Sequence, residues 1–561
     1  MTNKKIKPEK IKDIKYLLSS VIRREATFDT PKNCFFLGSG CSVASGVPTG
    51  KGVIEICRKL SFIENHHPDF ALNNEKKKEH DLYMMEVDQF IETKKKDFEK
   101  YVKEKESDFE PKNKEQIKNI EWTKGVPADV NFHKDCLYGN WFEEYNEDPK
   151  ERQKLIESII QDKKVGGEYI LFAHLIEQNL IHNVFTTNFD DLLNEALMKF
   201  FDKRARVYTH NEMAQYISIG SKKPNIIKLH GDYLFENKNS VAETTELSPN
   251  MKIKFTETLN NLDMIVSGYG GSDHSIMSLL EAIKKDRPFR LIWCGRDPNK
   301  LHWRVVNLIN NTQNSFFVEV PDFKTLVFKL WGIKSIMPKN LAKAGAEKQK
   351  ELDLFFNEFK SSIKDNKNIS EEEKSKFEAS LKACDYFNMA CKAYNEKDDN
   401  KAIELYSKAI ELNPKDVNAY YNRGGCFGRL KQYKKAIEDY NKAIALDSKY
   451  VNAYLNLSEL YIITGKEEDA WKTILNALSI SNVCLEDLIP ARYLECISLK
   501  LRNKDTQESE KALEKLLEQE IGLTWSFDSI DEWLETAAIN KETKTFIQGK
   551  TKLLKQFSKN K

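Results

Sequence analysis

A glycine-rich loop follows an apolar run near the start of the chain and could bind a phosphate group. It lies in "CFFLGSGCSVASGVPTG", residues 34–50, where the apolar run ends abruptly at Gly38-Ser39-Gly40. Glycines after a buried strand remove side chains, so that backbone N–H groups can approach a phosphate or pyrophosphate. The start of the following helix adds a favourable dipole. The sequence therefore predicts a nucleotide-binding loop at this position.

Three polar residues that could do chemistry follow other predicted strands. His230 ends the strand in "IIKLHGDY", and Asn188 and Asp190 lie in "VFTTNFDDLLNEAL". Ligands of open α/β sheets bind at the carboxyl ends of the strands. Imidazole titrates near neutral pH, which suits His230 to general-base catalysis; the alternative is a hydrogen-bonded structural histidine. The amide of Asn188 can hold a hydroxyl group or an attacking water, and Asp190 would orient its neighbours.

Two familiar phosphate-binding patterns do not fit the glycine-rich loop. The dinucleotide pattern GxGxxG requires a third glycine where this chain has Val43. The P-loop pattern GxxxxGK[ST] requires four residues between its glycines, but only three separate Gly46 from Gly50. In addition, Gly52 stands where Ser or Thr should bind magnesium. The loop therefore belongs to neither class.

The loop resembles that of the sirtuins, whose pattern is GAGxSxxxGIPxFR. The positions that agree are Gly38, Gly40, Ser42, Gly46, Val47 and Pro48. Gly50-Lys51 replaces the closing Phe-Arg of the family. The stretches "VFTTNFDDLLNEAL", "IIKLHGDY" and "IVSGYGGSDHSI" follow in the family order, over roughly residues 30 to 335. They are most similar to a bacterial sirtuin-like branch with TTNFDDLL, KLHG and GYSGSD signatures, and Gly270-Gly271 replaces its usual Ser-Gly.

The resemblance implies that the ligand is NAD+ and that its nicotinamide–ribose bond is cleaved. It assigns catalysis to Asn188, His230 and Asp190. The residues that it implies for NAD+ binding are Gly38, Ser39, Gly40, Ser42, Gly46, Pro48, Thr187, Gly268, Ser272 and Asp273. For the late loop at 268–273, the alternative is a tight turn that only needs glycine. Asp191 is expected to be a helix N-terminal charge instead.

The reaction depends on what accepts the ADP-ribosyl group. Protein-deacylating sirtuins carry a zinc module with paired CxxC motifs between the His-Gly strand and the late loop. Residues 231–267 contain no cysteine, and no CxxC pair occurs in the chain. We therefore expect no bound metal and favour water as the acceptor, with nicotinamide and ADP-ribose as products. Two alternatives stay open: an NAD-dependent protein deacylase whose substrate is recruited by the C-terminal repeats, and a scaffold in which NAD+ binding only signals.

Short β-rich runs alternate with helical patterns between residues 30 and 335 and would position these groups. The runs are 34–37, 182–186, 225–229, 264–267, 291–294 and 315–320. The rhythm predicts a parallel sheet with helices on its faces, a Rossmann-like α/β domain of sirtuin type at 1–335. A lysine- and glutamate-rich helical insertion at about 61–165 interrupts it. We interpret the insertion as a solvated helical cap, with a lid or an oligomer contact as the alternative.

The C-terminal part repeats every 34 residues. The residues that keep this interval are Ala402, Ala436 and Ala470, and Ala409, Ala443 and Ala477. The stretch "NKAIELYSKAIELNPKDVNAYYN" is followed in register by "KKAIEDYNKAIALDSKYVNAYLN", and the pattern resembles the tetratricopeptide repeat. It implies three repeats at about 385–482, a degenerate fourth at 486–520 and capping helices. We expect a helical linker at 336–382 and an all-α solenoid at 383–561.

Repeat solenoids present a concave groove, so this part predicts recognition of a protein or peptide, with a mere spacer or dimerisation element as the alternative. Asn388, Asn422 and Asn456 recur at the repeat interval and are predicted to face the groove. Sirtuin-like domains joined to sensory repeats resemble bacterial antiviral effectors, which deplete NAD+ in abortive infection. That resemblance implies a viral or host protein as trigger at the groove, and a homo-oligomer as one active form.

Bulk composition excludes several classes of protein. The 561 residues include 88 Lys and Arg against 86 Asp and Glu, a net charge of +2, so no global field attracts nucleic acid or an anionic membrane. No stretch approaches the roughly 20 apolar residues that cross a bilayer, and the start lacks an apolar signal core. We expect a cytoplasmic protein with reduced, mostly buried cysteines, and no nucleic acid or membrane partner.

Overall fold

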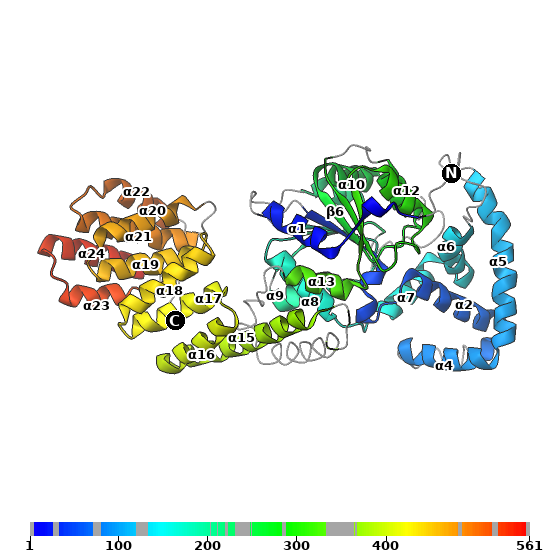
Figure 1. Ribbon diagram of the computed structural model, residues 1–561, viewed down its shortest axis with the longest axis horizontal. Helices are drawn as coiled ribbons and strands as arrows, with labels where there is room; N and C mark the ends of the chain where they lie inside the picture. Colours follow the sequence, from blue (N-terminus) through cyan, green and yellow to red (C-terminus); the bar gives the residue numbers. More distant parts are fainter. Residues whose placement is uncertain are drawn as a thin grey trace. The chain divides into compact units, whose positions relative to one another are not determined.

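The computed structural model of this chain forms two compact units. The residues that it describes are 5–25, 33–70, 80–118, 133–201, 203–209, 211–218, 223–230, 247, 249–282, 288–332, 364, 367, 369–480, 485–518 and 525–556. Among these residues, the division between the units falls between Lys374 and Ser375. The first unit is an α/β fold and the second is built from helices (Figure 1).

A single parallel sheet forms the centre of the first unit. It has eight strands among the described residues, in the order β1-β8-β7-β6-β2-β3-β5-β4. The bounds are β1 Ile11–Lys12, β2 Asn33–Leu37, β3 Asn183–Thr186, β4 Arg206–Tyr208, β5 Asn225–Lys228, β6 Asp263–Ser267, β7 Leu291–Gly295 and β8 Ser315–Glu319. Strands β2, β3, β5 and β6 are buried along their whole length, as parallel strands covered by helices must be. The predicted parallel α/β sheet is confirmed.

The two edge strands of the sheet, β1 and β4, were not among the six predicted from sequence. They are only two and three residues long. Each includes a charged residue, Lys12 and Arg206, and neither is wholly buried. An edge strand needs no continuous apolar run, because one of its sides has no neighbouring strand to pack beside. The hydrophobic pattern therefore carried no signal for them.

The strand order creates a topological switch point beside β2. From β2 the chain continues to β3, β4 and β5 on one side, and later adds β6, β7 and β8 on the other. Leu37 at the end of β2 pairs in register with Thr186 of β3 and Ser267 of β6, and Thr186 pairs with Lys228 of β5. The carboxyl ends of these strands therefore lie level at one edge, where open α/β sheets bind their ligands.

Successive side chains of β2 anchor helices on opposite faces of the sheet, because side chains alternate along a strand. The ring of Phe35 lies 5.0 Å from that of Phe172 in α8 (Gly167–Glu177), which packs with α9 (Leu192–Phe201) and α13 (Phe323–Trp331). The ring of Phe36 lies 5.9 Å from that of Phe255. Phe36 and Phe255 belong to an apolar cluster with residues of α10 (Pro249–Asn261), α11 (His274–Glu281) and α12 (Trp303–Asn311). The remaining described N-terminal elements are η1 (Pro8–Lys10), α1 (Ile14–Glu25) and η5 (Asn211–Tyr216).

The predicted insertion is helical and contributes to an apolar core of its own. Its helices are α4 (His80–Thr93), α5 (Lys95–Lys118), α6 (His133–Tyr145) and α7 (Pro149–Ile160), and α2 (Gly50–His66) leads into it. Buried side chains from all five pack in one cluster, among them Phe62, Val87, Tyr101, Trp141 and Ile156. The insertion is therefore a packed helical layer with a charged exterior, and not only a solvated cap.

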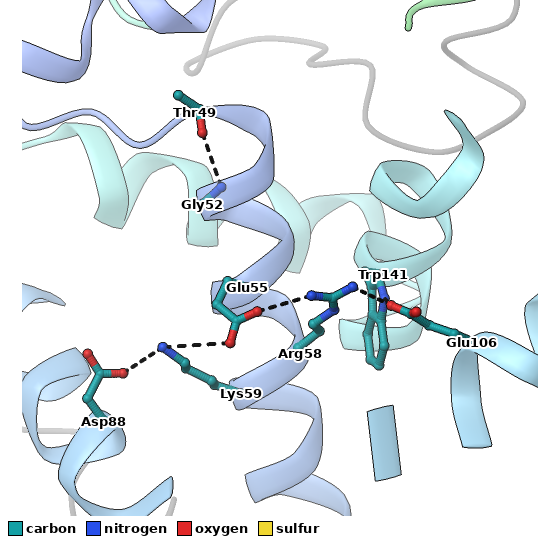
Figure 2. Close-up of polar contacts among 8 residues, drawn as sticks. All are labelled: Thr49, Gly52, Glu55, Arg58, Lys59, Asp88, Glu106 and Trp141. Carbon is teal, nitrogen blue, oxygen red and sulfur yellow. Dashed lines mark hydrogen bonds and ion pairs between the residues drawn. The ribbon is translucent and has the colours of Figure 1, made fainter. Parts of the chain in front are cut away.

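Polar contacts fix α2 within this layer (Figure 2). Arg58 pairs with Glu106 of α5, which also accepts a hydrogen bond of 3.1 Å from the indole nitrogen of buried Trp141. One residue further along α2, the Lys59 ammonium lies 2.8 Å from the carboxylate of Asp88 in α4. Helix α2 leaves the glycine-rich loop, so these contacts hold its N-terminal end in place beside that loop.

The second unit is a stack of antiparallel helix pairs, which confirms the predicted tetratricopeptide-like solenoid. Its helices are α15 (Glu371–Asn395, which begins in the first unit), α16 (Asp399–Leu412), α17 (Val417–Arg429), α18 (Tyr433–Leu446), α19 (Val451–Ile463), α20 (Glu467–Ser479), α21 (Leu485–Leu501), α22 (Gln507–Leu517), α23 (Asp528–Thr536) and α24 (Lys541–Lys555). Ala402, Ala436 and Ala470 are each 0% exposed. A Cβ added at Gly424 would lie 2.9 Å from the ring of Tyr440, so the small residues of the repeat allow close helix packing.

Two features of the helical unit refine the sequence reading. Helix α15 runs from Glu371 through the expected domain boundary at 382/383. Of the linker expected at 336–382, residues 336–363 lie outside the described part of the chain. Helices α21 and α22 form a pair where the degenerate fourth repeat was predicted. Of the last two helices, α23 packs against α19, and α24 packs against α21.

The described part of the chain contains neither a candidate membrane span nor a candidate metal cluster. There, no helix is long and apolar enough to cross a membrane. The same residues contain no group of three or more His, Cys, Asp or Glu side chains that could hold a metal ion. The cysteines described are free thiols, and most of them are buried.

Candidate functional site

The two glycine-containing loops meet backbone to backbone at the switch point. Gly38 N donates to Ser267 O at 2.9 Å, and Gly40 N donates to Gly268 O at 3.0 Å. A Cβ at Gly38 would lie 2.5 Å from Gly268 O, and Gly268 has a φ of +68°. Glycine is required at both positions, because no side chain fits between the two backbones and because the left-handed conformation disfavours other residues.

The first loop continues as two short turns, η2 (Ser39–Cys41) and η3 (Val43–Ser45). It leaves η3 through Gly46, which has a left-handed φ of +83°. The hydroxyl of Ser39 accepts a hydrogen bond of 3.3 Å from Gly50 N at the start of α2. The loop therefore ends at a helix N-terminus, whose dipole favours an anion such as a pyrophosphate.

Ser42 is the centre of a buried polar cluster that joins the first loop to the segment after β3. Its hydroxyl donates to Asp190 Oδ2 at 2.7 Å and lies 2.8 Å from the hydroxyl of Tyr169 in α8. Asn188 Nδ2 donates to Ser42 Oγ at 3.0 Å. All four residues are at most 6% exposed. The structure thus brings together Ser42, Asn188 and Asp190, which were singled out in two separate motifs.

Asn188 has a side-chain oxygen without a hydrogen-bond partner among the described residues. Its backbone N donates to Thr186 Oγ1 at 2.9 Å, and its Nδ2 is taken by Ser42. Its Oδ1 is buried and accepts no hydrogen bond from the described residues. An unpaired buried acceptor costs roughly 1–3 kcal/mol. The site therefore favours a ligand that donates a hydrogen bond to this oxygen, such as a hydroxyl group or a water.

Asp190 has both carboxylate oxygens occupied. Oδ2 accepts from Ser42, and Oδ1 accepts from Leu192 N at 3.4 Å at the start of α9. Burial raises the pKa of the Asp190 carboxyl, and the Ser42 hydrogen bond and the charge of Lys228 act in the opposite direction. Among the residues predicted as catalytic, Asp190 is therefore placed to position Ser42 and Asn188 rather than to meet a ligand.

His230 contacts the late loop. Its Nε2 lies 3.0 Å from Asp273 Oδ2, an ion-pair distance, and 3.2 Å from Ser275 Oγ. Asp273 Oδ1 accepts from N and Oγ of Ser275, each at 2.8 Å, and so caps α11. Burial acts to raise the pKa of Asp273, but the imidazole of His230 and the Ser275 hydrogen bonds outweigh it and hold the pKa below its usual value.

The predicted catalytic residues therefore fall into two hydrogen-bonded groups at the same sheet edge. One contains Asn188 and Asp190, and the other contains His230; no hydrogen bond between described residues joins His230 to Asn188. The other predicted binding residues line the same edge. Thr187 N donates to Leu37 O at 3.2 Å, and Ser272 is exposed in the late loop.

Lys228 belongs to this site, although the sequence reading did not single it out. At the end of β5 it is 1% exposed, its Nζ donates to Phe189 O at 3.1 Å, and it lies 3.5 Å from Asp191 Oδ1. It also lines a narrow cavity with Asn188. Lys228 thus ties the Asn188 segment to the strand that precedes His230. A signal was present, because a lysine in the apolar strand "NIIKL" must be paired if it is buried.

Helix α8 contributes two contacts that no motif indicated. Tyr169 joins the Ser42 cluster, and Glu168 Oε1 accepts a hydrogen bond of 2.7 Å from Ser45 Oγ in the first loop. Burial raises the pKa of the Glu168 carboxyl, while the Ser45 hydrogen bond lowers it. The sequence of α8 reads as an apolar core helix, so only its packing reveals that its first turn supports the loop.

Comparisons with known proteins agree with this division of the chain. Residues 182–308 match the family model described as SIR2-like domain, a range that includes Asn188, His230 and the late loop. Residues 417–450 match the tetratricopeptide repeat, and residues 393–431 match the TPR repeat. The chain therefore contains a SIR2-like segment, consistent with an NAD-related activity, followed by repeats of a protein-interaction type.

Similar solved structures concern the repeats. The Arabidopsis OM64 TPR domain is 26% identical, with 20% of this chain and 94% of that chain covered and a TM-score of 0.19. The first TPR of Spaghetti, bound to an HSP90 peptide, is 25% identical, with 20% and 90% covered and a TM-score of 0.19. MamA is 20% identical, with 32% and 95% covered and a TM-score of 0.23.

Proposed function

We propose that this chain, with its SIR2-like segment and its tetratricopeptide repeats, is an NAD+ glycohydrolase that cleaves NAD+ to nicotinamide and ADP-ribose. The observation that carries the proposal is the buried, unpartnered Oδ1 of Asn188 beside the glycine loops at the switch point. A ribose hydroxyl group or an attacking water would satisfy this oxygen. The N–H groups of Gly38, Gly40 and Gly46 are bonded within the protein, so the dipole at the N-terminus of α2 is what favours the pyrophosphate beside these loops.

The proposed reaction adds water across the glycosidic bond. The bond between C1′ of the ribose and the nicotinamide nitrogen breaks, and its electron pair neutralises the positive charge of the ring. The water oxygen bonds to C1′, and one of its protons is taken by the imidazole of His230 and then released to solvent. The products are nicotinamide, ADP-ribose and a proton.

Each group of the site has a distinct part in this scheme. Asn188 holds the hydroxyl group or the water, and its amide is kept in one orientation by Ser42, with which Tyr169 and Asp190 interact. His230 accepts the proton, and the carboxylate of Asp273, 3.0 Å away, stabilises the imidazolium that forms. Asp190 acts as a positioning residue.

Water is favoured as the acceptor because the chain lacks the cysteines of a deacylase zinc module. Residues 231–267, where that module would be inserted, contain no cysteine. We further propose that the repeats sense a viral or host protein and that the resulting loss of NAD+ serves antiviral defence. This is supported by the separation of parts, since the candidate chemistry lies in the first unit and the repeats form the second.

Purified protein incubated with NAD+ alone is expected to release nicotinamide and ADP-ribose in equal amounts. If the trigger is required, release should begin when a viral protein that causes NAD+ loss on co-expression is added. Chromatography of the products measures both. Release that occurs only with an acylated peptide would instead support deacylation, and binding of NAD+ without turnover, even with such a trigger, would support a scaffold.

A further inference from the structure

Equivalent positions on the first helices of the repeats differ in burial along the stack. Phe387 and Tyr421 occupy one repeat position and are partly buried, whereas Leu455 at the same position is 0% exposed. At another position Gly425 is partly buried, and its equivalent Glu459 is 8% exposed. Helix α23 packs against α19, which carries Leu455 and Glu459. The face of the third repeat is therefore covered, and a carboxylate lies beneath the cover.

Glu459 has no hydrogen-bond partner for its buried Oε1 among the described residues. Asn456 lies three residues earlier, on the same face of α19. Its Nδ2 donates to the Tyr421 hydroxyl at 3.0 Å and lies 3.3 Å from the Tyr440 hydroxyl. The amide nitrogen of Asn456 is thus engaged by these tyrosines, and that Asn456 faces the groove toward a peptide stays a prediction. The buried carboxylate, in contrast, lacks a donor.

Tyrosine side chains of neighbouring helices lie close to Gly425 and to Glu459. A Cβ at Gly425 would be in ordinary van der Waals contact with the Tyr440 hydroxyl at 3.8 Å and the Tyr394 hydroxyl at 3.9 Å, and the charge of Glu459 acts on Tyr421 and Tyr440. The rings of Tyr421 and Tyr440 lie 5.7 Å apart. Aromatic faces attract cations. The guanidinium of Arg429 already stacks on Tyr394, 3.6 Å from the ring centroid.

The charges around Glu459 favour a cation from outside. The titratable groups that interact electrostatically with Glu459 are Asp528 of α23, Tyr421 of α17, Tyr440 of α18 and Tyr493 of α21. None of these groups supplies a positive charge. Burial, and then the charge of Asp528, raise the pKa of Glu459 to about 8, so without a partner the carboxyl is mostly protonated at neutral pH. A cation bound beside it would favour the ionised form. A buried carboxylate is satisfied only by a paired cation or a hydrogen-bond donor.

We propose that the surface formed by Tyr421, Asn456 and Glu459 on the second unit is a binding site for a cationic side chain, arginine or lysine, of a protein partner. The side chain would enter along the partly buried Tyr421 and form an ion pair with Glu459. The site recognises charge, so it also predicts that the partner segment is basic. It goes beyond NAD+ hydrolysis and does not depend on it.

The binding test is done at pH 8.5, where the Glu459 carboxyl is mostly ionised. It uses the full chain and fluorescent, capped heptapeptides with one central arginine, lysine, glutamine or glutamate among alanines and glycines. The arginine and lysine peptides should bind at least about tenfold more tightly than the glutamine and glutamate peptides, as expected for a close charge pair. Glu459→Gln should remove that preference. Glu438→Gln, which removes the same charge from an exposed position of α18, should leave it within about twofold. Equal binding of the arginine and glutamine peptides, or equal loss in both variants, would overturn the proposal.

Substitutions of Tyr421 test the aromatic wall separately. Tyr421→Phe keeps the ring and should keep the preference for a cation, whereas Tyr421→Ala should weaken binding of the arginine peptide by about threefold or more. A loss that is the same in both variants would show that the hydroxyl, and not the ring face, matters, and would contradict the assigned cation site. These assays contain no NAD+, so their failure leaves the proposed hydrolysis untouched, and the converse also holds.

The same Glu459→Gln protein should be more stable than the parent at high pH, which separates loss of binding from loss of folding. The folded-state pKa of Glu459 is raised to about 8, and an unfolded glutamate ionises near about 4.3. The folded state therefore loses stability as the pH rises between these values, and glutamine avoids that loss. Thermal unfolding should show a Tm higher by roughly 5 °C at pH 8.5, and no difference near pH 4.3. A Tm difference of the same size at both values would contradict a buried, unpaired carboxyl.

Discussion

Replacing His230 by alanine is expected to lower nicotinamide release from NAD+ by about a hundredfold or more, as for loss of a general base. Asn188→Ala should cause a loss of similar size. Among the described residues of the Ser42 cluster, it removes the amide whose buried Oδ1 has no hydrogen-bond partner and would bind the ligand. Release is measured by chromatography under conditions in which the parent protein turns over. Undiminished release from a folded His230→Ala protein would contradict the role of His230 as general base.

This test must distinguish a loss of catalysis from a loss of folding, because His230 Nε2 also lies 3.0 Å from the carboxylate of Asp273. In His230→Gln the amide can still donate to Asp273 but cannot accept a proton at neutral pH. We expect this variant to keep its Tm better than His230→Ala and to be as inactive. His66→Ala, at an exposed position of α2, is the matched control and should retain full activity. An active His230→Gln protein would show that His230 orients the site without acting as a base.

Gly268→Ala is expected to destabilise the first unit by roughly 2–5 kcal/mol and to abolish NAD+ binding. A Cβ at this position would lie 2.6 Å from Cys41 N and 2.9 Å from Gly38 O. Overpacking of this kind costs about 1–3 kcal/mol. The left-handed φ of +68° adds about 1–2 kcal/mol for a residue with a Cβ. The two loops would have to separate, and the first loop would lose the Gly40–Gly268 hydrogen bond.

Gly270→Ala is the matched control, two residues away in the same loop. A Cβ at Gly270 meets nothing within 4 Å, and Gly270 is exposed. We expect a change in unfolding free energy within about 0.5 kcal/mol, as for most surface substitutions, and NAD+ binding close to that of the parent. Equal effects of the two substitutions on thermal unfolding and on NAD+ binding would refute the requirement for glycine at Gly268.

Much of the candidate site could be predicted from sequence, because each motif directly follows a buried strand. Gly38, Asn188, His230 and Gly268 come after β2, β3, β5 and β6, and parallel strands bring their carboxyl ends to one edge. The supporting residues were not predictable in the same way. Tyr169 comes from a helix that is mostly apolar and buried, and its hydroxyl acquires a role only where α8 packs beside the first loop.

By itself, the sequence determined the elements whose signals are local. Buried apolar runs indicated the six inner strands, and the 34-residue interval indicated the helical repeats. Both patterns can be recognised along the chain without knowing which distant segments come into contact. It could not show the two edge strands, whose few residues carry no apolar run, or an insertion packed around its own core.

Only the tertiary structure decided which polar groups are paired. Within the part of the chain that the structure describes, Asn188 Oδ1 accepts no hydrogen bond while both oxygens of Asp190 do, and His230 contacts Asp273 rather than Asn188. Glu459 is buried although its equivalent positions in the repeat are partly open, because α23 returns to cover α19. These outcomes depend on contacts between segments far apart in the chain. Only when those contacts have formed is a polar group buried, and only then does leaving it unpaired cost free energy.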